Sequence, residues 1–269
     1  MKRNSILFAI IGCASFCLAA EPSRISPAAP EDFSRSETMT LEQGVLVMNS
    51  GNHVTKQTIA VDRTRPGRLT FEYKLAPGAK PQTFVIAVHS VTAEGKYLVG
   101  GRIFAVAGTE TELVAPVRKG DRILKLKDAS RWQKLPLKLG IMVAFNAKPE
   151  GADLPNFEIS PLIAAVSAEG EVTLRSGISR EYPAGTMIRA HRDIGSFGIG
   201  SAYRRAGEEW KRETIEIHPW DPRLQCSWWP GVARAGIYLG FLNGKVPEGS
   251  GVMFRNIVLE QPEFTMTAL

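Results

Sequence analysis

Three tryptophans near the carboxyl end have the chemistry best suited to hold a ligand. Trp220, Trp228 and Trp229 fall within ten residues, in a segment that also contains Pro219, Pro222 and Pro230. Adjacent residues of an extended chain point to opposite faces, so one of the paired tryptophans can be core while the other is exposed. An exposed indole can stack on the apolar face of a pyranose, whereas a buried one only packs. We predict that the Pro219–Pro230 loop is the ligand-contacting edge.

A second group of polar residues contains Arg189, His191 and Asp193. A histidine can act as a general base when a partner holds it in place, but a strand end that enters a polar loop has the same composition. Lyases that act on uronic acids use His, Tyr and Arg, and Tyr182 and Tyr203 would complete that set. We therefore add Arg189, His191 and Asp193 to the three tryptophans as candidate ligand-binding residues and assign no catalytic residue.

Motifs for the common catalytic chemistries are missing from the sequence. It contains no nucleophile elbow, P-loop, dinucleotide fingerprint or zincin motif. Nothing among its 27 acidic residues singles out a carboxylate pair for glycoside hydrolysis. Asp121, Asp128 and Asp153 lie in predicted turns, where jelly rolls often hold calcium through oxygen ligands, although metal-free turn aspartates are commoner. We predict no cofactor, leave a structural calcium open and assign no metal ligands.

The first 20 residues have the pattern of a secretory signal peptide. Lys2 and Arg3 precede a short apolar run over residues 6–17, and small residues at 18–20 offer a cleavage site before Glu21. We predict a secreted or periplasmic protein. Residues 10–13 also resemble a bacterial lipobox, so the alternative is a lipid anchor at Cys13, and membrane contact is expected only in that case. No later segment approaches the roughly 20 apolar residues of a membrane span.

Cysteine content and charge limit the other options. Cys226 is the one cysteine outside the predicted signal peptide, so no disulfide can form within the mature chain, and we expect it to pack as a small hydrophobe. The formal net charge is +6. No nucleic-acid motif is present. The densest basic run is either the solvated face of a strand pair or a surface that attracts an anionic polymer; it comprises Lys119, Arg122, Lys125, Lys127, Arg131, Lys134 and Lys138.

Hydrophobic patterning predicts strands throughout. Leu69, Phe71 and Tyr73 alternate with polar residues, which is typical of a half-buried strand. Residues 237–241 and 252–259 form the last two predicted strands. The pattern from Thr58 onward predicts about twelve to fourteen short strands between Gly, Pro and Asp turns, and no run keeps a helical period for three turns. We predict an all-β protein, a two-sheet antiparallel β-sandwich that is jelly-roll-like, with little or no helix.

The same patterning divides the chain. We expect a signal peptide over residues 1–20 and an N-terminal tether over 21–56, which can lay Gly44–Met48 as a strand on the domain edge. Residues 57–262 form the predicted sandwich, and 263–269 form a C-terminal tail. A division of the sandwich into two half-domains near residues 150–160 stays open.

Two strands carry a family resemblance. Gly251–Glu260 resembles the last strand of jelly-roll carbohydrate-binding modules and galactose-binding-like domains, and Gly67–Tyr73 is similar to an opening strand of such domains. The resemblance implies a two-sheet sandwich that binds its ligand with loops at one end or on a concave face.

These observations favour a secreted bacterial β-sandwich protein that binds a glycan or an anionic polysaccharide and has no catalytic activity. One alternative is a polysaccharide lyase or glycoside hydrolase, which should hold His191 or a carboxylate pair in a deep cleft. The other is a structural or adhesive module of the cell envelope. A binder is expected to present a shallow face with an exposed tryptophan, and a structural module is expected to show neither feature.

Overall fold

The computed structural model describes residues 23–193, 197–242, 249 and 251–262. The predicted signal peptide with Cys13 and the predicted tail over 263–269 lie outside these residues. The described chain consists of short strands that pair antiparallel, joined by turns and 3-10 helices of three residues each. This confirms the all-β prediction. No helix in the described part is long and apolar enough to cross a membrane.

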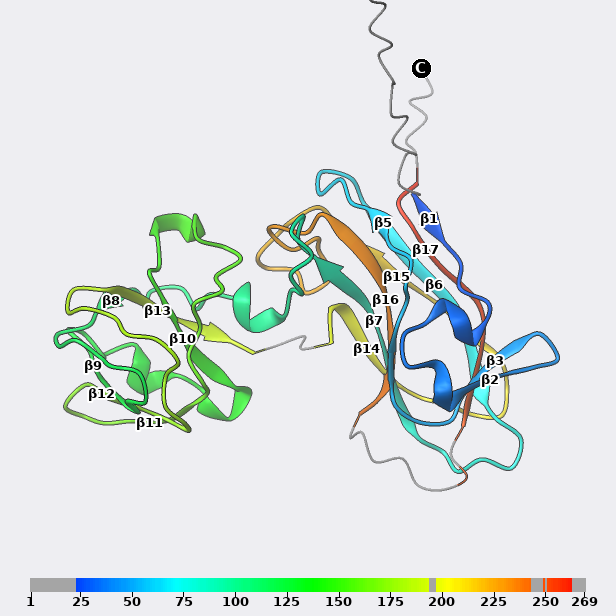
Figure 1. Cartoon of the computed structure of the whole chain (residues 1–269), viewed down its shortest axis with the longest axis horizontal. Coiled ribbons are helices and arrows are strands. Elements are labelled where there is room, and N and C mark those ends of the chain that lie inside the picture. Colours follow the sequence, from blue (N-terminus) through cyan, green and yellow to red (C-terminus); the bar gives the residue numbers. More distant parts are fainter. Residues whose placement is uncertain (1–22, 194–196, 243–248, 250, 263–269) are drawn as a thin grey trace, which may run out of the picture.

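One sheet forms the right-hand layer of the larger lobe in Figure 1. Its strand order is β15-β6-β17-β3-β2. β3 pairs with the first half of β17, and β1 pairs with the end of β17 along the same edge. The strands are β1 (Arg24–Ile25), β2 (Met39–Glu42), β3 (Val45–Met48), β6 (Gly67–Leu75), β15 (Lys211–Ile217) and β17 (Val252–Glu260).

The opposing sheet has the order β14-β7-β16-β4, with β5 on the same side of β16 as β4. Its strands are β4 (Asn52–Val54), β5 (Ile59–Ala60), β7 (Thr83–Val91), β14 (Ile199–Arg205) and β16 (Arg234–Phe241). The chain passes from one sheet to the other between β6 and β7, and again at each step from β14 to β17. Edge strands β14 and β15 therefore lie on the same side of the sandwich.

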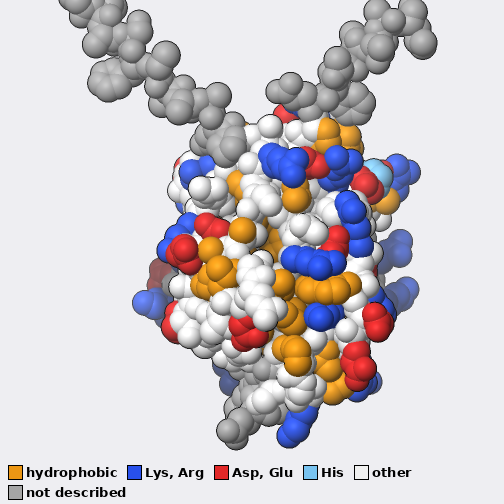
Figure 2. All heavy atoms as spheres, turned by 90° about the vertical axis from the view of Figure 1, so that its right-hand side faces the viewer, with side chains coloured by type: hydrophobic (Ala, Val, Ile, Leu, Met, Phe, Trp, Pro, Cys, Tyr) orange, Lys and Arg blue, Asp and Glu red, His pale blue; other side chains and the backbone are white. Residues whose placement is uncertain are grey.

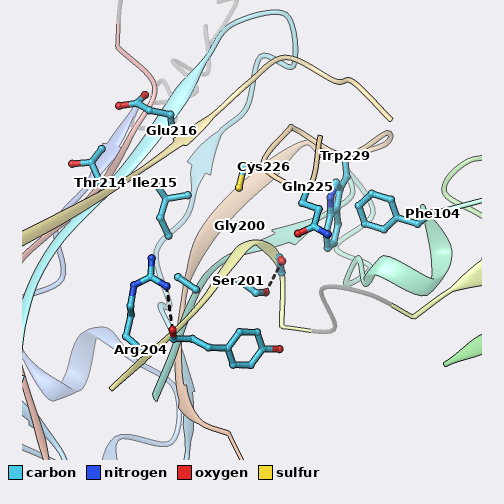
Figure 3. Close-up of a pocket in the computed structure, with 13 residues that line it drawn as sticks. Phe104, Gly200, Ser201, Arg204, Thr214, Ile215, Glu216, Gln225, Cys226 and Trp229 are labelled. Carbon is cyan, nitrogen blue, oxygen red and sulfur yellow. Dashed lines mark hydrogen bonds between the residues drawn. The ribbon is translucent and has the colours of Figure 1, made fainter. Parts of the chain in front are cut away.

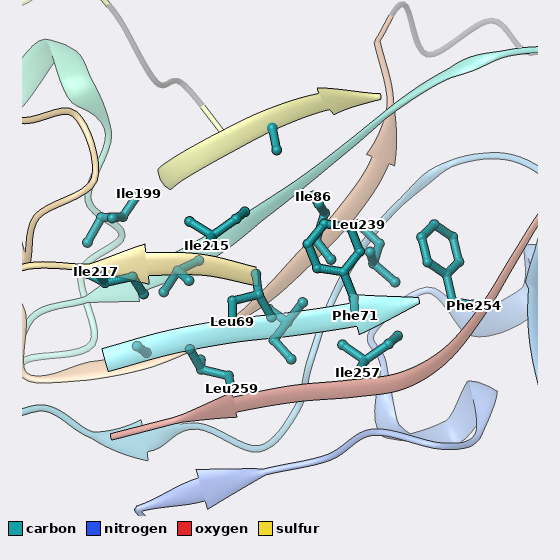
Figure 4. Close-up of a cluster of buried hydrophobic side chains, with 14 of the residues drawn as sticks. Leu69, Phe71, Ile86, Ile199, Ile215, Ile217, Leu239, Phe254, Ile257 and Leu259 are labelled. Carbon is teal, nitrogen blue, oxygen red and sulfur yellow. The ribbon is translucent and has the colours of Figure 1, made fainter. Parts of the chain in front are cut away.

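Side-chain alternation explains why the two sheets stack. In β6, Leu69, Phe71 and Tyr73 are buried as predicted, while the intervening residues face outward. Residues of β15 and β17 share their cluster with apolar residues of the opposing sheet, among them Ile86 and Leu239 (Figure 4). Burying these side chains between two layers is the main driving force for the sandwich-like fold.

A smaller lobe is inserted between β7 and β14 and lies apart from the sandwich in Figure 1. Two three-stranded sheets, β10-β13-β8 and β11-β12-β9, enclose its own apolar core around Trp132. The strands are β8 (Thr111–Glu112), β9 (Ile123–Lys125), β10 (Ile141–Phe145), β11 (Ile163–Val166), β12 (Glu171–Leu174) and β13 (Met187–Arg192). The 3-10 helices of the described residues are η1 (Pro30–Asp32), η2 (Ser36–Thr38), η3 (Gly100–Arg102), η4 (Trp132–Lys134), η5 (Leu137–Leu139) and η6 (Pro149–Gly151).

The chain is divided differently from the expectation in two places. Residues 24–54 supply β1 to β4 instead of a tether, and β3 lies between β17 and β2 instead of at an edge. The leucine and methionine of β3 are buried, so this segment belongs to the core and not to a linker. Residues 150–160 lie within the inserted lobe, since its core draws on residues from Leu113 to Ala190. The two cores separate instead after β7 and before β14.

We predict that Phe254→Ala lowers the free energy of unfolding by about 3–5 kcal/mol, the usual cost of truncating a buried aromatic. Phe254 is 0% exposed and packs edge-on against Phe84, with ring centroids 5.1 Å apart. Leu41→Ala is the matched control, because Leu41 is 50% exposed on the edge strand β2, and it should change stability by less than about 1 kcal/mol. Urea unfolding at neutral pH measures both. A small effect of Phe254→Ala would show that β17 is peripheral to the core.

Candidate functional site

The predicted ligand-contacting loop, Pro219–Pro230, connects β15 to β16 and is fixed at its base. The His218 amide donates to the Cys226 carbonyl, and the Trp228 amide donates to the His218 carbonyl, each at 2.9 Å. Within the loop, the Arg223 guanidinium binds the Asp221 carboxylate at 2.6 Å. A loop closed in this way can hold its side chains in a defined position.

Neither Trp228 nor Trp229 presents a stacking face, which corrects the expectation that one of them could be exposed. They are 0% and 1% exposed. The Trp228 indole N–H donates to the Arg65 carbonyl at 2.8 Å, and its ring lies directly over Gly67, where a Cβ would come within 2.4 Å of it. Trp229 packs edge-on against Phe104 with ring centroids 5.8 Å apart. This segment crosses from one sheet to the other, so both of its sides are covered.

Trp220 differs from the other two tryptophans because it is only partly buried. One side of it packs on the sandwich core, and it also borders an open hollow together with Pro219 and residues 61–64. The Asp62 carboxylate in that hollow accepts bonds from the hydroxyl and amide of Thr64, at 2.6 and 3.0 Å. These bonds lower the pKa of Asp62, so its carboxylate is charged at neutral pH, and Arg63 lines the same hollow.

A pocket of about 420 Å³ opens on the other side of the loop. It lies between the edge strands β14 and β15, where neither sheet has a further strand in the described chain to cover the gap. Gln225, Cys226 and Trp229 of the loop close one end, and Phe104, which follows η3, reaches in from the inserted lobe (Figure 3). The pocket therefore lies at the junction of the two lobes, a common position for ligand sites.

Two glycines shape this pocket, Gly198 just before β14 and Gly200 within it. The pairing of β14 with β7 shifts between Ile199 and Ala202, which marks a β-bulge. Gly198 has φ +136, and a Cβ there would come within 2.2 Å of the Val88 carbonyl oxygen. Gly200 has φ +63, and a Cβ there would come within 2.8 Å of Ile215. Only glycine fits these positions, so the backbone of the bulge forms part of the pocket wall.

The pocket lining is partly apolar and partly polar. Phe104, Ile215 and Trp229 supply apolar surface, and Ser201, Thr214 and Gln225 supply neutral hydrogen-bonding groups. At its charged end, the Nε of Arg204 donates to Glu213 at 2.6 Å. The hydroxyl of Tyr73 donates to the same carboxylate at 2.7 Å, and burial together with this bond raises the pKa of Tyr73 to about 12. The Arg204 guanidinium is thus held in one orientation.

Cys226 is a free, half-buried thiol in this lining. Burial raises its pKa, so the thiol is protonated at neutral pH and is a weak nucleophile. The indole nitrogen of Trp229, in the same lining, is buried and has no hydrogen-bond partner among the described residues. Unsatisfied buried donors are rare in folded proteins.

Arg189 and His191 form a buried polar network at the base of the inserted lobe. They lie on one face of β13, while Ile188 and Ala190 on the other face pack into the core of that lobe. Arg189 binds the Asp153 carboxylate at 2.9 Å and lies 3.1 Å from the Nε2 of His191. The His191 Nδ1 lies 2.9 Å from the Gly101 carbonyl, a geometry that fits a neutral ring with its proton on Nδ1.

This network has the character of a structural support. Arg189 and His191 are 1% and 0% exposed, so a ligand that arrives from solvent cannot contact them. Asp193 does not complete a catalytic group with them in the described structure; its amide donates to the Gly140 carbonyl at 2.7 Å, and burial raises the pKa of its carboxyl. The site prediction placed these three residues with the tryptophans, but they belong to the inserted lobe and do not line the pocket beside the Pro219–Pro230 loop.

The turn aspartates considered as calcium ligands have protein partners. Asp121 accepts the Arg118 amide, Asp128 accepts the Ser130 amide, and Asp153 binds Arg189. The part of the chain that the structure describes contains no group of three His, Cys, Asp or Glu side chains placed to hold a metal ion. In the basic run, Lys125 pairs with Glu171 and Lys127 pairs with Glu112, each at 3.2 Å, so part of its charge is balanced.

The fold and the pocket define an all-β, sandwich-like protein with a candidate ligand site between two edge strands. The chain matches no protein-family model, and neither the curated proteins nor the solved structures yield a match.

Several residues of the pocket were not identified from the sequence. Phe104, Ser201 and Arg204 come from segments far from the loop, and nothing in the local pattern connects them to it. Gly198 and Gly200 did carry a usable signal. Isolated glycines in a strand pattern indicate a bulge or a close backbone approach, and both occur here.

The His191 network predicts a loss of stability in mild acid. Burial is the main cause that lowers the pKa of His191 to about 4, while an unfolded histidine titrates near 6.5. Between these values the unfolded chain binds more protons, so the free energy of unfolding should fall by roughly 3 kcal/mol as the pH drops from 6.5 to 4. Burial lowers the pKa of His89 as well and adds to the same effect.

Urea unfolding at pH 7 and pH 4.5 measures this loss. In His191→Asn the difference between the two pH values should shrink, because the buried group that resists protonation is gone. His218→Asn is the control, since His218 is exposed, and it should keep the wild-type difference. An unchanged difference in His191→Asn would show that another group causes the acid sensitivity.

Proposed function

We propose that this protein is an exported, non-enzymatic binding protein that holds a saccharide in the pocket between β14 and β15. As the sequence predicts, it would act outside the cytoplasm, in the periplasm or the extracellular space, and would need no cofactor. The Trp220 hollow on the other side of the Pro219–Pro230 loop would hold an adjoining part of the same ligand.

The observation that carries this proposal is the composition of one pocket. Its volume of about 420 Å³ falls within the range of roughly 300–1,000 Å³ that is usual for small-ligand sites. A pyranose has an apolar face and a rim of hydroxyls. The apolar surface of Phe104 and Ile215 suits the former, and the hydrogen-bonding groups of Ser201 and Gln225 suit the latter. Arg204, held by Glu213, adds a fixed donor.

Binding explains the site better than hydrolysis or elimination does. Glycoside hydrolysis needs a pair of carboxyl groups on either side of the bond, and Glu216 is the one acidic residue in the described lining. The lyase hypothesis relied on His191, which is enclosed by Gly101 and Arg189. A structural module remains the alternative, and it would bind no glycan in the pocket.

A glycan array probed with mature protein, residues 21–269, tests the proposal. Each positive glycan is then used to protect Cys226 from alkylation by iodoacetamide, with labelling measured by mass spectrometry. Cys226 is the one cysteine within residues 21–269 and lines the pocket, so a bound sugar should slow its labelling severalfold. Glycans that bind without protecting Cys226 would place the site elsewhere, and an array without positives would favour the structural module.

Paired variants locate the contact. Gln225→Ala should weaken binding about five- to tenfold through the lost hydrogen bond, while Leu224→Ala, its exposed neighbour outside the pocket lining, should bind normally. Trp220→Ala should weaken binding only of glycans long enough to reach the hollow. Titration calorimetry gives the affinities, and thermal melting verifies that each variant is folded. Equal effects of Gln225→Ala and Leu224→Ala would contradict the proposed contact.

A further inference from the structure

A polar groove with a volume of about 550 Å³ crosses the outer face of the first sheet and meets the pocket of the proposed function at β15, where Thr214 and Glu216 line both. It runs over β15, β6 and β17 to β1, and its lining is almost entirely polar. Figure 2 views the molecule from the side of β1 and β2 and shows basic and acidic side chains interspersed on that surface. The strand register shows how the groove is built.

Three cross-strand rows make up the groove. The floor is the middle row, in which the hydroxyls of Thr70 and Thr214 lie 3.0 Å apart and Val258 pairs with Thr70. Charged rows form the two walls. One wall contains Arg212, Glu72 and Asn256, with Arg255 next to it outside the lining, and the other contains Glu216, Arg68, Glu260 and Arg24. The walls are four residues apart along β15, roughly 13 Å between their Cα atoms.

A β-bulge in β17 enriches one wall in hydrogen-bond donors. The pairing of β17 with β6 shifts between Arg255 and Val258, and Asn256 has φ +51. Both Arg255 and Asn256 therefore face outward, while Phe254 and Ile257 on either side of them are buried. Each donates to the carboxylate of Glu72, Arg255 at 2.7 Å and Asn256 at 3.1 Å. Arg255 also stacks over the ring of Trp210, at 4.1 Å.

The arginines of the groove are exposed while two of its three carboxylates are shielded. The side chains of Arg24 and Arg68 are 61% and 49% exposed, whereas those of Glu260 and Glu72 are 17% and 13% exposed. Arg68 and Arg255 bind these carboxylates through Nε, and their terminal NH2 groups make no hydrogen bond within the described structure. The groove thus presents oriented guanidinium donors and keeps two of its acceptors occupied.

Arg212 adds free donors to a lining that holds three arginines and three glutamates. It lies opposite Glu72 in the register, is exposed, and has no ion pair within the described structure. Glu216 is the exposed carboxylate of the groove, in the opposite wall. Its distance from Arg212 exceeds the Debye length of about 10 Å at 0.1 M salt, so it only weakly opposes an anion bound there.

From this arrangement we propose that the groove binds an acidic oligosaccharide, with a uronate carboxylate on Arg212 and the sugar rings over the threonine floor. Planar guanidinium groups bind carboxylates through paired, charge-assisted hydrogen bonds. The methyl groups of Thr70, Thr214 and Val258 give the rings an apolar support between the walls. This site shares with the saccharide pocket only Thr214 and Glu216 of β15, and the proposal does not depend on the function of that pocket.

Short oligogalacturonates are the probe, and the same chains with methyl-esterified carboxyl groups are the matched neutral ligand. Titration calorimetry with mature protein should detect binding of the acid form and at least tenfold weaker binding of the ester, because an ester cannot pair with a guanidinium. A sulfated oligosaccharide of equal length tests whether the groove prefers the planar carboxylate. Equal or tighter binding of the sulfated chain would overturn the assignment to uronates.

Charge-matched variants locate the site. Arg212→Gln should weaken oligogalacturonate binding about tenfold or more, whereas Arg205→Gln should bind within twofold of wild type, because Arg205 is exposed on β14 outside the groove. Val258→Phe fills the floor from a position that does not line the pocket, and it should abolish binding while circular dichroism stays unchanged. Equal losses in Arg212→Gln and Arg205→Gln would show that the interaction is general charge attraction and would overturn the proposal.

One readout separates this site from the pocket. Oligogalacturonate should leave the alkylation rate of Cys226 unchanged, and Gln225→Ala should bind it normally. Protection of Cys226 by the acid chain, together with normal binding by Val258→Phe, would move the acidic ligand to the pocket and contradict the groove. The absence of any neutral glycan that protects Cys226 would contradict only the proposed function.

Discussion

A single close backbone approach, Gly198 against the carbonyl of Val88, determines how the edge strand β14 joins the second sheet. A Cβ at residue 198 would come within 2.2 Å of that oxygen, and φ of +136 is a conformation that other residues rarely adopt. The approach lets β14 pair with β7 directly where the chain returns from the inserted lobe, and the bulge then brings Gly200 onto Ile215. The opening between β14 and β15, and so the pocket, follows from these contacts.

A buried charge network inside the inserted lobe fixes the segments of that lobe that contact the sandwich. A buried guanidinium is costly unless it is paired, so Arg189, Asp153 and His191 are stable only as a set. The set fixes Gly101 through its carbonyl, three residues before Phe104 of the pocket. It also fixes the loop that carries Pro155. The ring of Pro155 packs closely on Gly231 of the sandwich, where a Cβ on residue 231 would lie 2.7 Å from the proline Cδ. Residues that cannot reach a ligand thus position one that can.

The sequence was informative where structure follows from local alternation and uninformative where it follows from distant contacts. Leu69, Phe71 and Tyr73 face the core as their period predicted, because a strand with one buried face has few alternatives. The alternation rule failed at Trp228 and Trp229. It assumes that one side of the chain faces solvent, but both sides of the connection from β15 to β16 are covered at these residues. Arg189 and His191 were recognised as a polar group, but their burial depends on Asp153 and Gly101, which the sequence does not place near them.

The pocket and the groove share the edge strand β15. Thr214 and Glu216 line both of them, because they point outward on a strand whose alternate residues, Ile215 and Ile217, enter the core. β15 pairs only with β6 in the described chain, so no further strand separates the two sites. One glycan chain crossing this rim could place neutral rings in the pocket and acidic rings in the groove. Occupation of one site would then raise the effective concentration of the chain at the other, which increases affinity without any new contact.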